Sequence, residues 1–428
     1  MDRRSFIQGA AAAAATMWAT SRTDIVRAQP LAGDGPFGPL GPPNSDGIQL
    51  PAGFSSRLIA VSATPVAGTA HIWHGFPDGG ACAPLAGGGW AYVSNGEVGD
   101  GLGEVGVIAF DAAGNVVDAY PILRGTTRNC SGGMTPWGSC LSGEEHIAGQ
   151  VFECDPTMRS QGVPRPLLGT FGHEMIGVDP ATGFVYLVED HPEGRLYRFE
   201  PDHVGDLTEG TLLAAQTSPD GAVTWKRVSH LFPDRAQDTT PFNGGEGVWI
   251  MHGSMFFTTK GDVRVWRLEL ANQRLSIWYD AATVAGTCLT AVDNIVGHPH
   301  SSDLFVAEDG GNLEVAMLPT QGHPVVAPFL RFVGHDASEV SGLAFNPDGT
   351  RLYVSSQRGV DGLTGMVFEV SGRFHRTQRI WERLDRPSLR QPVAQAATVT
   401  NVSLKQAPLP NASPVAGVSA LTPRPSRW

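Results

Sequence analysis

The stretch Gly172–Asp190 reads GHEMIGVDPATGFVYLVED, and Gly194–Phe199 continues with GRLYRF. An acidic residue stands near the start of a first apolar strand, and the DPATG segment has the composition of a tight turn. Two more short apolar strands follow. Apolar runs of this length between Pro, Asp and Gly turns predict antiparallel β-strands. We therefore interpret this unit as one multi-stranded sheet.

Related units recur along the chain at spacings of several tens of residues. They begin near Gly88, Gly245, Asp293 and Glu339. Small sheets that repeat at such a spacing are typical of a β-propeller. The predicted fold class is all-β, a β-propeller of about six blades. A β-sandwich fits less well, because the units resemble one another too closely.

Composition agrees with many short strands and limits the possible partners. The 428 residues include 53 glycines and 32 prolines, and the formal net charge is −12. Nucleic acid is not an expected partner, because binding its phosphates requires a basic face. An acidic balance is compatible with cation binding.

The two ends of the chain differ from its middle. Residues 1–28 contain Arg3-Arg4, an alanine-rich run, and Val26 and Ala28 before a possible cleavage point. This order is typical of a twin-arginine signal peptide, and the apolar run is too short to span a membrane. It predicts export to the periplasm or medium, with the twin-arginine translocation machinery as a partner. Residues 29–50 are expected to be an extended lead-in and 51–375 the catalytic propeller. Residues 376–428 form a basic and then Pro/Ala/Ser-rich tail whose end is expected to be disordered.

Five cysteines are present, an odd number, so at least one cannot pair within the chain. No C-x-x-C pattern occurs, which argues against a zinc ribbon. In an exported protein, disulfides among Cys82, Cys140, Cys154 and Cys288 are possible, and the sequence leaves their connectivity open.

The innermost strands of a propeller line a central channel, so residues at equivalent strand starts converge at one end of it. Four polar residues occupy such starts: Glu174, Glu246, Asn294 and Glu339. Carboxylates brought together in this way repel one another unless cations hold them. The pattern therefore predicts a metal site on the propeller axis.

The segment Asn129–Glu145, NCSGGMTPWGSCLSGEE, resembles the corresponding segment of the PhoX-type alkaline phosphatases. That family has Asn-Cys-Ala-Gly-Gly-x-Thr-Pro-Trp-Gly-Thr before a Glu-Glu pair. Further motifs follow in the family's order over roughly residues 50–370. They are Asn95-x-Glu97, His173-Glu174, Gly245–Gly247, Asp293-Asn294 with His298-Pro299, Glu308-Asp309 and Glu339–Gly342.

The resemblance implies a six-bladed propeller that hydrolyses small phosphate esters with two Fe³⁺ and three Ca²⁺ ions. It implies that Cys130 is the iron thiolate, and that Glu144 or Glu145, Glu174 and Glu246 are iron or bridging ligands. Oxygens on the calcium side would come from Asn95, Asn294, Glu308, Asp309 and Glu339. Cys130, Glu174 and Glu246 would be the catalytic set. Thiolate suits a transition metal, and hard oxygens suit calcium.

One departure from the family stands at Gly244, where relatives carry an arginine that contacts the substrate phosphate. Its loss removes a charge-assisted contact of about 1.5–3 kcal/mol. Candidate replacements are Arg124, Arg128, Lys260 and Arg358. Two other functions stay open. One is a calcium-dependent hydrolase of another bond, such as a lactonase, which has no need of Cys130. The other is a non-catalytic metal-binding propeller.

Overall fold

The structure is a computed structural model, and it describes residues 31–32, 35–233, 235, 238–320 and 325–374. The predicted signal peptide, residues 1–28, and the predicted tail, residues 376–428, lie outside the described residues.

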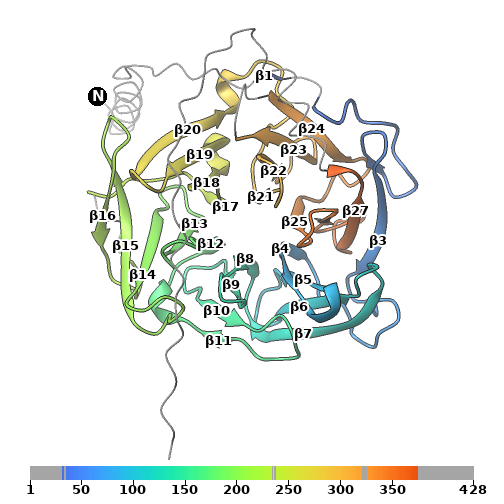
Figure 1. Ribbon diagram of the computed structural model, residues 1–428, viewed down its shortest axis with the longest axis horizontal. Helices are drawn as coiled ribbons and strands as arrows, with labels where there is room; N and C mark the ends of the chain where they lie inside the picture. Colours follow the sequence, from blue (N-terminus) through green and yellow to red (C-terminus); the bar gives the residue numbers. More distant parts are fainter. Residues whose placement is uncertain (1–30, 33–34, 234, 236–237, 321–324, 375–428) are drawn as a thin grey trace, which may run out of the picture. The chain divides into compact units, whose positions relative to one another are not determined.

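Six small β-sheets surround a central axis, as Figure 1 shows, and we number them as blades in chain order. Blade 1 contains β4 (Pro77–Pro84), β5 (Trp90–Gly96), β6 (Gly103–Phe110) and β7 (Val116–Thr126). Blade 2 contains β8 (Asn129–Met134), β9 (Cys140–Glu144), β10 (Val151–Cys154) and β11 (Val163–Pro164). Blade 3 contains β12 (His173–Val178), β13 (Val185–Glu189), β14 (Leu196–Pro201), β15 (Gly210–Thr217) and β16 (Val223–Arg227).

The remaining blades complete the ring. Blade 4 contains β17 (Gly245–Met251), β18 (Ser254–Thr259), β19 (Arg264–Glu269) and β20 (Arg274–Asp280). Blade 5 contains β21 (Ile295–Gly297), β22 (Asp303–Ala307), β23 (Glu314–Pro319) and β24 (Val325–Phe332), joined by β1 (Leu31–Ala32) and β2 (Ile48–Gln49). Blade 6 contains β25 (Val340–Phe345), β26 (Arg351–Ser356), β27 (Met366–Ser371) and β3 (Ser55–Val61). The predicted fold class, an all-β six-bladed propeller, is confirmed.

Blade 6 closes the ring with strands from both ends of the propeller. Its outermost strand β3 comes from the N-terminal side and pairs antiparallel with β27, from Ser55↔Ser371 to Val61↔Met366. This pairing ties the first and last parts of the propeller into one sheet. In the lead-in, β1 and β2 both pair with the outer strand β24 of blade 5.

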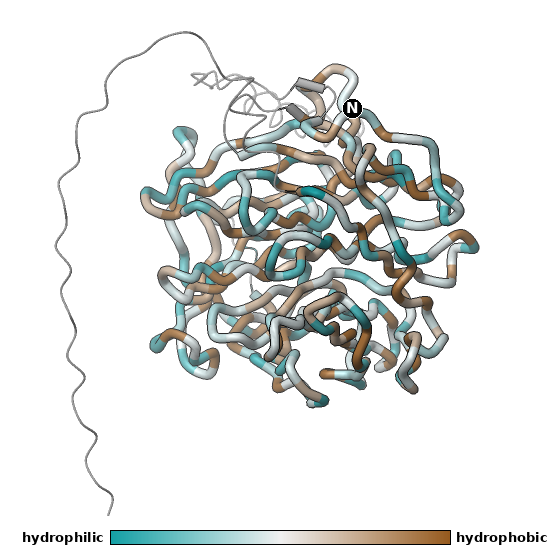
Figure 2. The backbone as a smooth tube through the Cα atoms, turned by 45° about the vertical axis from the view of Figure 1, so that its right-hand side comes forward, coloured by the Kyte–Doolittle hydropathy of each residue, from teal (hydrophilic) through white to brown (hydrophobic). Residues whose placement is uncertain are grey.

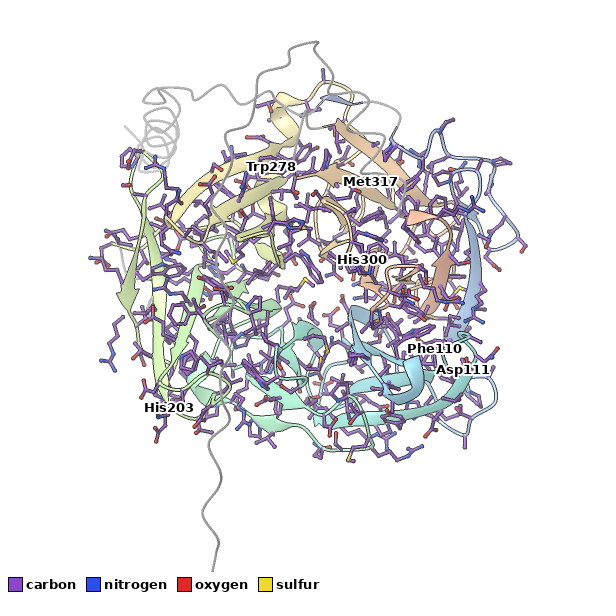
Figure 3. All side chains as sticks on the ribbon, viewed as in Figure 1. Phe110, Asp111, His203, Trp278, His300 and Met317 are labelled. Carbon is purple, nitrogen blue, oxygen red and sulfur yellow. The ribbon has the colours of Figure 1, made fainter. Side chains whose placement is uncertain are left out.

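Apolar side chains fill the space between neighbouring sheets, and they hold the blades together. Between blades 5 and 6, Phe305 packs edge to face on Phe329 and on Phe345, each at a ring-centroid distance of 5.1 Å. Such aromatic pairs add stability beyond their buried area. Figure 3 shows side chains packed between the ribbons around the ring, and Figure 2 shows hydrophobic and hydrophilic residues interspersed along the backbone.

Helical structure in the described part of the chain is limited to short 3₁₀ turns. They are η1 (Ala86–Gly88), η2 (Pro166–Leu168), η3 (Lys260–Asp262) and η4 (Ala281–Thr283). No described helix is long and apolar enough to cross a membrane. All five cysteines are free thiols, although Cys140 on β9 and Cys154 on β10 are opposite one another in the ladder.

Candidate metal centre

The innermost strand of every blade places one acidic or thiol side chain at the same end of the channel. Each is the second residue of β4, β8, β12 or β17, or stands one or two positions before the start of β25 or β21. We call them the inner ring: Asp78, Cys130, Glu174, Glu246, Asp293 and Glu339. The strands run outward from the axis in sheet order, so six distant parts of the sequence converge here (Figure 1).

A second set of charged residues follows the second strand of each blade. Because the first two strands are antiparallel, the end of the second lies beside the start of the first. We call this set the outer ring: Glu97, Glu145, Asp190, Lys260, Asp309 and Arg358. Each of them stands one or two residues after β5, β9, β13, β18, β22 or β26.

The two rings enclose a cavity of about 290 Å³. Its lining contains one cysteine, eight carboxylates and three basic side chains. The carboxylates are Asp78, Glu97, Glu145, Glu174, Glu246, Asp293, Asp309 and Glu339, and the basic residues are Arg128, Lys260 and Arg358. If all ionise, eight negative charges face three positive ones, so the lining carries an excess of five negative charges.

β-Bulges and glycines explain how the innermost strands present these side chains. Register shifts occur in β4, β8, β12, β17 and β25, and bulges of this kind re-aim side chains next to functional sites. In β8 a Cβ on Gly132 would lie 1.8 Å from the carbonyl oxygen of Leu141. In β4 a Cβ on Gly79 would lie 2.7 Å from Cα of Ser131. Only glycine permits these close approaches beside Cys130 and Asp78.

Three groups of side chains have ligand atoms close enough to share one cation. Within each group the atoms lie within 4.8 Å of one another. The groups are Cys130/Glu145/Glu174, Asp78/Glu97/Glu339 and Glu174/Asp190/Glu246. Cys130 is buried, and its Sγ lies 3.0 Å from Oε2 of Glu174 and 3.6 Å from Oδ2 of Asp78.

Burial and mutual repulsion raise the pKa of the acids in the inner ring. Burial raises the pKa of Asp78 well above its usual value, and the charges of Asp293 and Glu339 add to the effect. Burial and then Asp309 raise the pKa of Asp293 to about 7. Burial and then Asp293 raise the pKa of Glu339 to about 8. These carboxyl groups therefore hold protons more tightly than free carboxyl groups do.

The part of the cavity around Cys130 has the same electrostatics. Burial is the main cause of the pKa of Cys130 being well above that of a free thiol, with Asp78 and Glu174 as the nearest contributing charges. Burial, and after it Glu246 and Glu145, raises the pKa of Glu174. Burial and then Glu97 raise the pKa of Glu145 to about 9. Thiolate and carboxylates would ionise here when a cation binds them.

The three basic residues of the cavity have different partners. Nζ of Lys260 lies 2.9 Å from Oδ2 of Asp190 and 2.8 Å from Oε1 of Glu246. Nη1 of Arg358 lies 2.9 Å from Oε2 of Glu339. Arg128 is exposed, and within the described residues its side chain makes no ion pair with a carboxylate. Arg128 is thus available to an anion that enters the cavity.

Four of the predicted ligands, Asn95, Glu144, Asn294 and Glu308, are not part of the cavity lining, and their side chains make hydrogen bonds within the protein. Oε1 of Glu144 accepts from the Thr127 amide at 2.8 Å, and Oε2 accepts from the Gln150 amide at 3.1 Å. The Glu308 carboxylate accepts from four backbone amides, those of Thr290, Ala291, Asn312 and Glu314. In the pairs Glu144-Glu145 and Glu308-Asp309, the first acid therefore fixes the loop and the second faces the cavity.

The two predicted amide ligands also make hydrogen bonds within the protein, Asn95 to a carbonyl and a serine hydroxyl and Asn294 to a backbone amide. Nδ2 of Asn95 donates to the Gly79 carbonyl at 2.6 Å, and its Oδ1 accepts from Oγ of Ser142 at 2.7 Å. Oδ1 of Asn294 accepts from the Gly342 amide at 3.1 Å. Of the predicted set, the structure brings six residues into the cavity lining: Cys130, Glu145, Glu174, Glu246, Asp309 and Glu339.

Sequence reasoning did not include Asp78, Glu97, Asp190 and Asp293 among the candidate ligands. For Asp78 a signal existed, because Asp78-Gly79-Gly80 precedes a strand much as Cys130-Ser131-Gly132-Gly133 does. For Asp293 the sequence pattern favoured its neighbour Asn294, which occupies the aligned position, whereas in the structure Asp293 lines the cavity and Oδ1 of Asn294 accepts from the Gly342 amide.

Comparisons with known proteins bear on this site. Residues 111–285 match the sequence model of the family described as Alkaline phosphatase PhoX. The fold is similar to that of Pseudomonas fluorescens PhoX in complex with vanadate, a transition state analogue, at 14% identity and a TM-score of 0.61, over 80% of this chain and 98% of that one. A gluconolactonase from Xanthomonas campestris is 12% identical over 78% of this chain and 97% of its own, with a TM-score of 0.46. Among curated proteins, none matches this sequence.

Proposed function

Because the chain belongs to the PhoX-type alkaline phosphatase family, whose members are phosphoric ester hydrolases, we propose that it hydrolyses phosphate esters at a multinuclear metal centre in the cavity. The observation that carries the proposal is the convergence of one thiol and eight carboxylates from all six blades on a single cavity. Such a charge cluster is costly unless cations compensate it.

The donor atoms of two groups fit different metals. Cys130, Glu145 and Glu174 combine a soft sulfur with carboxylate oxygens, which suits a transition metal such as iron. Asp78, Glu97 and Glu339 offer oxygen alone, which suits calcium. We propose Fe³⁺ for the first group and Ca²⁺ for the second. When bound, these ions would supply Lewis-acid stabilisation of the charge on the phosphoryl group.

The chain's own basic residues would bind and orient the substrate phosphate. Arg128 is exposed at the cavity without a carboxylate partner among the described residues. It precedes blade 2, on one side of blade 1, and Arg358 comes from blade 6, on the other side. A guanidinium binds phosphate through paired, charge-assisted hydrogen bonds. We propose that Arg128 and Arg358 replace the arginine that the family has at the position of Gly244. Arg124 does not line the cavity and instead pairs with Glu104.

A phosphate-release assay tests this function. We expect the metal-loaded protein to hydrolyse an aryl phosphate, a chelator to abolish turnover, and re-addition of iron and calcium to restore it. Arg128→Met should raise KM more than it lowers kcat, because Arg128 is placed to bind phosphate before and during reaction. Arg124→Met, a nearby arginine outside the cavity, is the matched control. Absence of turnover in protein shown to hold both metals would refute the proposal.

We also propose that the protein is exported through the twin-arginine pathway. The support is the order of Arg3-Arg4, alanine-rich run and small residues in the first 28 residues. Replacing both arginines by lysine should leave the protein in the cytoplasm, as detected by cell fractionation. Equal amounts of both forms outside the cytoplasm would contradict this proposal.

A further inference from the structure

The outer ring of the cavity changes sign at two places, at Lys260 in blade 4 and at Arg358 in blade 6. At the end of the second strand, blades 1, 2, 3 and 5 each place a carboxylate: Glu97, Glu145, Asp190 and Asp309. Blade 4 places Lys260 there instead. The chain has three lysines in 428 residues, Lys226, Lys260 and Lys405, so a lysine inside an acidic cavity is a marked exception to its composition.

The ammonium group of Lys260 contacts two of the three carboxylates of the third ligand group. That group consists of Glu174, Asp190 and Glu246, whose oxygens lie within 4.8 Å of one another. Nζ of Lys260 donates a hydrogen bond to Oδ2 of Asp190 at 2.9 Å and lies 2.8 Å from Oε1 of Glu246. Oε1 of Glu246 is buried and has no aligned hydrogen-bond donor, so the ammonium charge compensates it through proximity.

The backbone around Lys260 keeps its side chain in this place. The Lys260 amide donates to the Gly244 carbonyl at 2.8 Å. Gly244 has a φ of +69°, and a Cβ on it would lie 2.9 Å from Cγ of Lys260. The absence of a side chain at position 244 therefore leaves the room that the lysine stem occupies. Gly244 and Lys260 form one structural unit.

We propose that the ammonium of Lys260 is a resident cation that takes the place of one metal ion in the Glu174/Asp190/Glu246 group. Metal ions would then bind at the Cys130 group and the Asp78 group, and the centre of this protein would hold one ion fewer than its carboxylates could support. The inference rests on the proposed metal centre and not on the reaction that occurs there.

The metal stoichiometry of a variant without the Lys260 charge tests whether the ammonium replaces a metal ion. Wild type, Lys260→Met and Lys260→Arg are stripped with chelator, reloaded with excess Fe³⁺ and Ca²⁺, desalted and analysed by elemental mass spectrometry. We expect Lys260→Met to bind one more ion per chain than wild type, because the methionine leaves the three carboxylates without a cation. Lys260→Arg, which keeps the charge, should match wild type. Lys226→Met, at a half-exposed lysine paired with Asp238, is the control for loss of a lysine.

Equal and non-zero metal content in wild type and Lys260→Met would overturn the inference while leaving the proposed function intact. A wild type that binds no metal would sink the proposed function instead, and a gain in Lys260→Met would still support the resident cation. The two failures are therefore distinguishable.

A measurement on the wild type avoids dependence on the folding of a variant. Amine acetylation followed by peptide mass mapping compares Lys260 with Lys226 in metal-free and metal-loaded protein. We expect Lys260 to react at least tenfold more slowly than Lys226 in both states, because two carboxylates hold its ammonium. If metal loading makes Lys260 as reactive as Lys226, metal expels the lysine and the inference is wrong.

Discussion

Removal of metal should make the stability of this protein fall steeply with rising pH, and Glu339 allows the size of the effect to be worked out. Burial, Asp293 and Asp309 raise the pKa of Glu339 from 4.5 to about 8 in the metal-free fold. The fold therefore binds the proton more tightly than the unfolded chain does. The stability that this proton provides is present in full below the unfolded pKa, and it is lost as the pH rises through the folded pKa.

The magnitude follows from the shift. Three and a half pKa units correspond to about 5 kcal/mol, of which about 4 kcal/mol is lost between roughly pH 5 and pH 9. Residues 51–374 give an unfolding entropy of about 0.7 kcal/mol/K from the average per residue. A loss of about 4 kcal/mol thus lowers Tm by about 6 °C.

Thermal denaturation in excess chelator at the two pH values is the assay. Glu339→Gln removes the titrating group, so its Tm should fall by about 6 °C less than that of wild type over this range. Glu209→Gln removes one charge from an exposed surface residue and should behave as wild type. Identical pH slopes for wild type and Glu339→Gln would refute the reasoning. Saturating metal should flatten the wild-type slope, because bound cations replace the protons.

Three further predictions concern the neighbourhood of the thiol. Cys130→Ser removes the soft ligand with little change of shape, so elemental analysis should show iron content falling by more than half while calcium content is retained. Glu145→Gln should lower metal content without lowering the Tm of the metal-free protein. Glu144→Gln weakens two hydrogen bonds to backbone amides, so it should cost about 1–3 kcal/mol of stability in urea unfolding. It should leave metal stoichiometry unchanged. Gly79→Ala should destabilise by about 1–3 kcal/mol, because its Cβ would meet Cα of Ser131 at 2.7 Å. A urea midpoint equal to that of wild type would contradict the packing argument.

Local patterns in the sequence carry much of the fold. The unit at Gly172–Phe199 predicts strands and turns that the structure has as β12, β13 and β14. Its recurrence predicts a propeller, because a small sheet with two apolar faces must pack against neighbours of the same kind. The closing pair of β27 with β3 was beyond such reasoning, since it joins segments about 310 residues apart.

In the candidate site, too, the sequence predicts some features and leaves others to the tertiary structure. Sequence repeats indicated Glu174, Glu246 and Glu339, because equivalent strand starts must meet at the channel. They could not tell which member of an acidic pair faces the cavity. Glu144 and Glu145 are adjacent and chemically alike, and the choice between them depends on which carboxylate the loop amides capture.

The sequence by itself determined the repeating strands, the Gly-Gly segment beside Cys130 and the set of acids available to a metal. Tertiary structure decided which of these acids lie close enough to share a cation and that Lys260 pairs with Asp190 and Glu246. The physical reason is range. Strand alternation and turn chemistry are properties of residues that are neighbours in the sequence. A ligand group depends instead on distances of a few ångströms between side chains of different blades. Bulges and backbone hydrogen bonds set those distances.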